Sequence, residues 1–188
     1  MVTLFRNLRN VIDYVGYICS IVGSVVPRGT TLLDVGCGDG AITRTLSDQY
    51  GIKTDGVDVF PQDYAQYDGV TLPFADGSFD ASLICFSTHH ADDPQRVLDE
   101  AVRVAKRRVV VIECVTNSAA RRAVTIALDY AVNILTHPHE RFPMTFHTSD
   151  WWHSQFKRLG LRLVAEQRLS TWPVRVYDQR LFLLEVTR

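Results

Sequence analysis

The stretch from Leu32 to Gly40, Leu-Leu-Asp-Val-Gly-Cys-Gly-Asp-Gly, places an acidic residue just before glycines at every second position. The apolar residues that open it predict a buried parallel strand that turns sharply into a helix. Glycine leaves the backbone bare where a ligand must come close, and it accepts conformations that other residues avoid. We therefore expect a ligand to bind at this turn, beside Asp34.

Two classes of ligand fit this glycine pattern. Gly36 to Ala41 matches the dinucleotide fingerprint Gly-x-Gly-x-x-Ala, and Asp58 follows about twenty residues on, where a ribose-binding acid is expected. A carboxylate at Asp34 would repel a pyrophosphate, but it suits a ligand that carries an amino group. The 188 residues are also too few for a nucleotide domain plus a separate hydride-acceptor domain. An adenosyl ligand is therefore favoured, and a nicotinamide-dependent enzyme is the alternative.

Two further motifs follow, Asp68-Gly69-Val70-Thr71-Leu72-Pro73-Phe74 and Asp76-Gly77-Ser78-Phe79-Asp80. With the glycine turn and Asp58, they make residues 32–92 resemble the class I S-adenosylmethionine-dependent methyltransferases, specifically the small "type 11" group. The resemblance implies a Rossmann-like fold, S-adenosyl-L-methionine as methyl donor and S-adenosyl-L-homocysteine as product. It implies an enzyme; a non-catalytic module that binds the same cofactor and regulates a partner is the alternative.

The resemblance also implies which residues bind the cofactor. The methionine moiety would be held by Asp34 and by the backbone of Gly36, Cys37 and Gly38. Both ribose hydroxyls would donate to Asp58. The adenine ring would lie among Val59, Phe60, Asp68, Gly69 and Val70, and the sulfonium near Phe86 and Ser87. Asp68 has a simpler alternative role as a turn residue beside Gly69.

His89 and His90 are the candidate catalytic residues. They follow the strand that ends near Phe86, close to the expected methyl group, and the pKa of histidine suits proton transfer near neutrality. Alternatively, they only cap the turn. Four other histidines, His137, His139, His147 and His153, could suggest a metal, but no accompanying carboxylate pattern or cysteine pair supports one, and we expect no metal site.

Alternating strand and helix patterns predict an α/β fold with a doubly wound, seven-stranded sheet. We expect strands at 31–35, 54–59, 69–71, 79–86, 109–115, 161–169 and 180–187. The helices expected between them cover residues 39–49, 92–105, 117–135 and 149–159. The last two strands are joined by a loop alone, so the sheet should be parallel except for an antiparallel C-terminal end.

We expect a single methyltransferase domain over residues 1–188. Its parts would be an N-terminal helical cap (1–28), a cofactor-binding core (29–116), a helical lid inserted after the fifth strand (117–150), and a C-terminal helix with a strand pair (151–188). The aromatic and methionine residues expected to line the acceptor side are Tyr130, Phe142, Met144, Phe146, Trp151 and Trp152. Their apolar character favours a small, largely hydrophobic acceptor.

Composition narrows the range of partners. Twenty basic and twenty-one acidic residues give a net charge of −1, which argues against nucleic-acid binding by bulk charge. The apolar run at 11–26 is shorter than the roughly 20 residues that a bilayer span needs, so we expect a helix packed on the domain, with peripheral membrane contact as the alternative. The scattered cysteines indicate reduced thiols in a cytoplasmic protein. Homo-oligomer formation is left open.

Overall fold

The computed structural model describes residues 2–60, 63–136, 143–169 and 177–187. Within these residues, seven strands form one sheet in the order β3-β2-β1-β4-β5-β7-β6. β7 runs antiparallel to both of its neighbours, β5 and β6, whereas the other neighbouring strands are parallel. The strands are β1 (Thr31–Val35), β2 (Lys53–Asp58), β3 (Ala65–Gln66), β4 (Phe79–Cys85), β5 (Ala105–Cys114), β6 (Leu161–Arg168) and β7 (Gln179–Val186). The predicted mixed sheet is confirmed.

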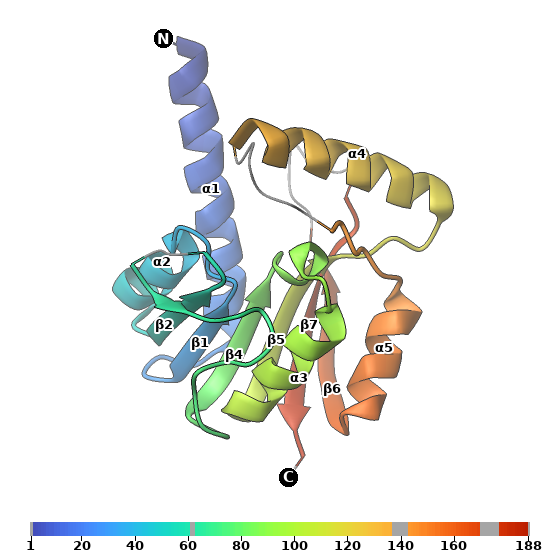
Figure 1. The fold of residues 1–188 in the computed structure, drawn as a ribbon. Coiled ribbons are helices and arrows are strands. Elements are labelled where there is room, and N and C mark those ends of the chain that lie inside the picture. Colours follow the sequence, from blue (N-terminus) through green and yellow to red (C-terminus); the bar gives the residue numbers. More distant parts are fainter. Residues whose placement is uncertain (1, 61–62, 137–142, 170–176, 188) are drawn as a thin grey trace.

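Helices cover both faces of the sheet, and one helix lies above it (Figure 1). Helices α1 (Val2–Val25) and α2 (Ala41–Tyr50) pack on one face, and α3 (Pro94–Val104) and α5 (Ser149–Arg158) pack on the other. Helix α4 (Ala119–Thr136) lies across the edge where the parallel strands end, near the short helix η1 (Thr88–His90). This edge is where open parallel sheets bind ligands.

The buried residues of β1 show how the sheet divides the core. Leu33 and Val35 belong to the apolar cluster that includes the inner faces of α3 and α5, whereas Leu32 packs among residues of α1 and α2. Because successive side chains of a strand point to opposite faces, a strand buried on both sides needs a continuous apolar run. Asp34 interrupts that run, and it is only 2% exposed.

The predicted position of the third strand is wrong. It was expected at 69–71, but the chain instead pairs with β2 at Ala65–Gln66. The amides of Val70 and Thr71 donate to the side chain of Asp68, at 2.8 and 2.7 Å. Because those amides close a turn, they are not available to a neighbouring strand.

Two other elements begin earlier than expected. Helix α1 starts at Val2 rather than near residue 11, because the arginines at 6 and 9 interrupt the apolar run without disfavouring a helix. Strand β5 starts at Ala105, directly after α3, rather than at residue 109 as expected. The segment has no glycine or proline to form a turn, and Ala105 is already extended, with φ −86° and ψ 133°.

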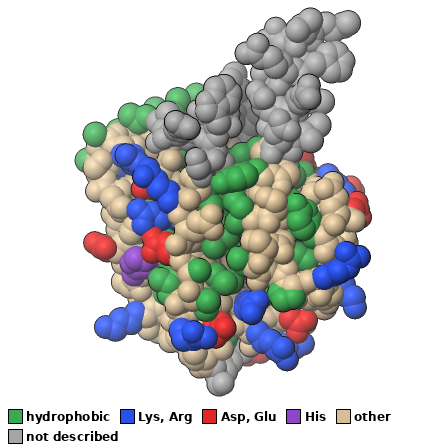
Figure 2. All heavy atoms as spheres, turned by 180° about the vertical axis from the view of Figure 1, so that it is seen from behind, with side chains coloured by type: hydrophobic (Ala, Val, Ile, Leu, Met, Phe, Trp, Pro, Cys, Tyr) green, Lys and Arg blue, Asp and Glu red, His purple; other side chains and the backbone are tan. Residues whose placement is uncertain are grey.

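The face seen from behind carries hydrophobic side chains in its middle and Lys and Arg mainly around its margin (Figure 2). The charges of both signs are therefore spread out on this face rather than gathered in one basic patch. Among the described residues, no helix is both long and apolar enough to span a bilayer.

Candidate functional site

The glycine turn after β1 adopts a backbone that other residues rarely reach. Gly36, Gly38 and Gly40 have φ values of 75°, 53° and 72°. The amides of Gly36 and Cys37 donate to the carbonyl of Val57, at 2.8 and 3.2 Å, which fixes the turn to the end of β2. A Cβ at Gly36 would lie 2.4 Å from that of Ser87, so no side chain fits there.

Asp34 lies behind this turn as a buried carboxyl group. Its Oδ2 accepts a hydrogen bond of 2.7 Å from the hydroxyl of Thr43 on α2. Burial raises its pKa to about 6, with a smaller opposing effect of the Thr43 hydrogen bond and a further rise from the nearby charge of Asp58. A cationic group placed against this carboxyl would favour its ionised form.

Asp58 ends β2 and holds the glycine turn from the other side. Its two oxygens accept one backbone amide each, Gly38 at 2.8 Å and Phe60 at 3.1 Å. The carboxylate is thereby fixed in orientation, and each oxygen keeps lone-pair capacity for a second donor. Asp34 and Asp58 thus flank one glycine turn, and their predicted contacts with an amino group and a ribose stay a prediction.

Solvent-exposed apolar side chains lie near Asp58. Val59, Phe60 and Val70 are 38, 39 and 53% exposed, although all three are hydrophobic. A Cβ at Gly69 would be in ordinary contact with Val59, at 3.5 Å, so the two loops meet. Asp68 itself accepts the two turn amides, which lower its pKa, and this is the turn role that the sequence left as the alternative.

Tyr64 also belongs to this region, although sequence reasoning missed it. A Cβ at Gly40 would lie 2.1 Å from its ring, and one at Gly56 would lie 2.9 Å from it. The ring therefore packs over bare backbone at the start of α2 and on β2. The one available signal was the pair of glycines without a side chain, and a glycine does not identify the residue that covers it.

The end of β4 meets the same turn. The hydroxyl of Ser87 donates to the carbonyl of Val35 at 2.8 Å, and Phe86 has a strained φ of 53°. The ring of Tyr14, from α1, lies 6.1 Å from that of Phe86, and its hydroxyl accepts a hydrogen bond of 3.2 Å from Gln179 on β7. The sequence did not predict that α1 and β7 reach the site.

His89 is held by a buried glutamate at the end of β5. Its Nδ1 lies 2.8 Å from Oε2 of Glu113, and the side chains of His89 and Glu113 are 5 and 1% exposed. Both the amide and the hydroxyl of Thr88 donate to Oε1 of Glu113, at 2.9 and 2.6 Å. Burial opposes charge on His89, but the Glu113 carboxylate outweighs it and raises the pKa of His89. The same pairing lowers the pKa of Glu113 despite its burial.

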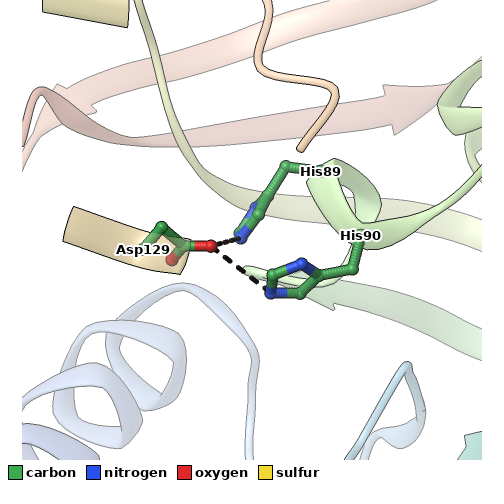
Figure 3. Close-up of side chains that lie close together, drawn as sticks. All are labelled: His89, His90 and Asp129. Atoms are coloured by element: carbon green, nitrogen blue, oxygen red, sulfur yellow. Dashed lines mark ion pairs between the residues drawn. The ribbon is translucent and has the colours of Figure 1, made fainter. Parts of the chain in front are cut away.

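Asp129 on α4 faces both histidines (Figure 3). Its Oδ2 lies 3.8 Å from Nε2 of His89 and 3.8 Å from Nε2 of His90. The ring of His89 is stacked on Phe146, with centroids 4.5 Å apart. Burial raises the pKa of Asp129, while the charge of His89 opposes that rise. Neither Glu113 nor Asp129 was predicted, because both lie far along the chain from His89.

The predicted lid residues divide among several environments. Met144 and Phe146 are buried in a small apolar cluster with Cys114, against which Phe86, Ile126 and Tyr177 pack. Trp152 belongs to the main core instead, with Trp151 at its border, and Tyr130 is 53% exposed. His147 stacks on Trp151, and His153 pairs with Glu166. The remaining predicted residues, Phe142, His137 and His139, lie outside the described part of the chain.

Comparison with known proteins yields one family and several relatives. Residues 33–112 match the model of a family described as "Methyltransferase domain". The chain is 30% identical over 135 residues to 2-methyl-6-phytyl-1,4-hydroquinone methyltransferase of Synechocystis sp., an alignment that covers 63% of this chain and 42% of that protein. It is 35% identical over 111 residues to demethylmenaquinone methyltransferase of Tropheryma whipplei, covering 50% of this chain and 45% of that protein. The chain thus spans less than half the length of these curated relatives.

The fold is shared with solved structures at low sequence identity. One is magnesium protoporphyrin IX methyltransferase from Synechocystis with bound SAH, at a TM-score of 0.66 and 14% identity. That superposition covers 95% of this chain and 84% of the other. Its agreement extends beyond residues 33–112, so the whole sheet follows a known arrangement.

Proposed function

We propose that this chain, whose core is a domain of the class I S-adenosylmethionine-dependent methyltransferase family, transfers a methyl group from S-adenosylmethionine to a small, partly hydrophobic acceptor. One observation carries the proposal. The buried carboxyl of Asp34 and the oriented carboxylate of Asp58 flank a glycine turn in which a side chain at Gly36 would collide with Ser87 and one at Gly40 with Tyr64.

These residues fit each part of the cofactor. The ammonium group of the methionine moiety would be held near Asp34, and the ribose hydroxyls would donate to the free lone pairs of Asp58. Val59, Phe60 and Val70 would cover the adenine ring, which accounts for their exposure without a ligand. The backbone of Gly36, Cys37 and Gly38, with Gly69, allows close approach, while Asp68 shapes the loop.

Phe86 and Ser87 would border the reacting methyl group at the end of β4. The bound cofactor supplies a methyl group made electrophilic by its sulfonium, so the protein need only align a nucleophile in line and exclude water. We assign His89 and His90 to the acceptor's reacting atom, where they would receive its proton. Glu113 would fix the ring of His89 so that Nε2 faces the acceptor.

The acceptor side of the site is apolar. Met144, Phe146 and Cys114 form a buried cluster that Phe86 borders. Relatives named for a hydroquinone and a demethylmenaquinone support an acceptor with a flat, apolar ring that carries oxygen substituents, which are hydroxyls in the hydroquinone. We place α4 and residues 143–150 as the lid over it.

The four free cysteines support a cytoplasmic location.

Calorimetry with S-adenosylhomocysteine tests the cofactor site. We expect one molecule bound per chain and binding at least about tenfold weaker in Asp58→Ala, because a charge-assisted hydrogen bond is lost. Asp55→Ala, an exposed acid on the same strand, is the matched control. Equal affinity in wild type and Asp58→Ala would overturn the assignment.

Transfer itself is tested with labelled S-adenosylmethionine and a panel of phenols and hydroquinones. Labelled product would support the enzyme. Tight cofactor binding with no transfer to any member of the panel would instead favour the non-catalytic module that the sequence left open.

A further inference from the structure

Three side-chain atoms converge above the carboxyl ends of β4 and β5 without hydrogen-bonding one another. The Nε2 atoms of His89 and His90 each lie 3.8 Å from Oδ2 of Asp129. All three atoms lie within 4.8 Å of one another (Figure 3). A separation of 3.8 Å is too long for a hydrogen bond. It is close to the roughly 3.4 Å that separates two ligand atoms of a tetrahedral zinc ion with bonds near 2.1 Å.

We propose that His89, His90 and Asp129 bind one divalent transition-metal ion, with Zn²⁺ as the best match. Two imidazoles with one carboxylate are a ligand set that suits Zn²⁺ and its neighbours, whereas Mg²⁺ and Ca²⁺ prefer oxygen ligands. Three protein ligands leave a coordination position open, as in catalytic zinc sites.

Glu113 orients one of the proposed ligands through a hydrogen bond, as residues around a metal site commonly do. A metal-bound histidine commonly donates its other ring N–H to a carboxylate, which fixes the tautomer and the ring orientation. His89 has this arrangement, because its Nδ1 lies 2.8 Å from Oε2 of Glu113. Glu113 is itself fixed by the amide and hydroxyl of Thr88, and Phe146 stacks on the histidine ring. The ring of His89 is therefore held with Nε2 directed at Asp129.

The ligands come from two separate elements. His89 and His90 lie on η1 after β4, whereas Asp129 lies on α4, which crosses above the sheet. An ion at this point would fasten α4 over the end of β4, next to Phe86. Its open position would face the acceptor side of the site.

The ion's role in the reaction rests on the proposed methyl transfer, whereas its binding does not. A hydroxyl of the acceptor could occupy the open position, where the ion would lower the pKa of that hydroxyl. The hydroxyl proton would leave to water, and the oxygen would form a bond to the methyl carbon as the carbon–sulfur bond breaks. With the ion bound, both Nε2 lone pairs would be used in coordination, so the ion would take over the activation that we propose for the metal-free histidines.

Titration of the metal-free protein with Co²⁺ or Zn²⁺ tests the site. We expect one equivalent to bind, with visible absorption bands for Co²⁺ that Zn²⁺ abolishes. His90→Ala and Asp129→Asn should each weaken binding at least about tenfold, and Glu113→Gln should weaken it about 10- to 100-fold. His153→Ala is the matched control, because His153 pairs with Glu166 on the far strand β6.

S-adenosylhomocysteine binding to each variant reports whether it is folded and separates this proposal from the proposed function. Lack of stoichiometric metal binding by a wild-type protein that binds S-adenosylhomocysteine would overturn the metal site alone. Unchanged metal affinity in both His90→Ala and Asp129→Asn would do the same. Stoichiometric metal binding without any S-adenosylhomocysteine binding would overturn the proposed function and leave the metal site standing.

Discussion

At the scale of a single residue, the buried carboxyl of Asp34 lowers the stability of the ligand-free protein. A carboxyl with 2% exposure, whose Oδ2 is bonded to a neutral hydroxyl, is a poor place for a charge. Asp34 nevertheless occupies a position of β1 at which a buried strand would ordinarily have an apolar residue. A ligand cation placed against the carboxyl would reverse this balance, and this supports the binding role that we propose for Asp34.

Asp34→Asn should therefore stabilise the ligand-free protein near neutral pH and weaken cofactor binding. The pKa of Asp34 is raised from 3.8 to about 6 in the fold. Ionisation of Asp34 is thus disfavoured in the folded state. The carboxyl therefore does not reduce the free energy of unfolding below pH 4, and it reduces this free energy by its full amount above pH 6. The penalty removed at pH 7 is at most about 3 kcal/mol. Urea unfolding of wild type and Asp34→Asn at pH 4, 5, 6 and 7 measures this difference in stability. If the variant's extra stability does not shrink toward pH 4, the ionisation of Asp34 is not its cause.

Gly36 defines a second prediction at this scale. Gly36→Ala combines a φ of 75° with a Cβ only 2.4 Å from that of Ser87. We expect a loss of about 1–3 kcal/mol in unfolding free energy and a loss of cofactor binding. Adding Ser87→Gly should recover part of the stability, because it removes the contact but not the backbone strain. No recovery in the double variant would show that strain alone accounts for the loss.

At the scale of elements, the loop that carries Asp68 and Val70 depends on α3. Arg103 donates to Oε1 and Oε2 of Glu100 and to the carbonyls of Leu72 and Phe74. Glu100, only 3% exposed, also accepts the amide of Leu72. A helix on one face of the sheet thus fixes the loop that would cover the adenine ring.

Arg103→Ala should accordingly destabilise the protein by about 3 kcal/mol, because it leaves the buried carboxylate of Glu100 without its closest cation. It should also weaken S-adenosylhomocysteine binding, since the loop loses its attachment. Arg107→Ala, an exposed arginine on the adjacent strand β5, should change stability by less than about 0.5 kcal/mol. Chemical unfolding and calorimetry of the two variants check both effects, and similar losses in both would contradict the role of Arg103.

At the scale of the whole molecule, the site collects residues from most of the chain. Residues from several elements meet at one edge of the sheet. They are Tyr14 of α1, the turn after β1, the ends of β2, β4 and β5, and Asp129 of α4. A ligand bound there would contact elements from both halves of the sequence. Cofactor binding should therefore stabilise the molecule as a unit.

S-adenosylhomocysteine at 100 times its dissociation constant should add about 2.7 kcal/mol to the unfolding free energy of the wild type. For a domain of this size, the midpoint of thermal unfolding should rise by several degrees. Asp58→Ala at the same ligand concentration should show a much smaller rise, and Asp55→Ala should match the wild type. A rise that is equal in all three proteins would place the ligand elsewhere.

The sequence by itself determined the order of strands and helices along the chain, and it identified the residues that we propose to bind the cofactor. Apolar strand patterns, the glycine turn, Asp34 and Asp58 are local signals, because each follows the end of a predicted strand. The position of β3 was missed for a local reason as well, since the side chain of Asp68 takes the amides that a strand would have used.

Only the tertiary structure decided which residues gather on the side of the site that we propose for the acceptor. Glu113 lies 24 residues from His89, and Tyr14 lies 165 residues from Gln179, yet each pair is in hydrogen-bond contact. Asp129 reaches the histidines because α4 folds back over the sheet. Nothing in the local pattern of a helix or strand identifies its distant partners. The packing of the whole chain determines which side chains meet, and so it alone brought His89, His90, Glu113 and Asp129 together.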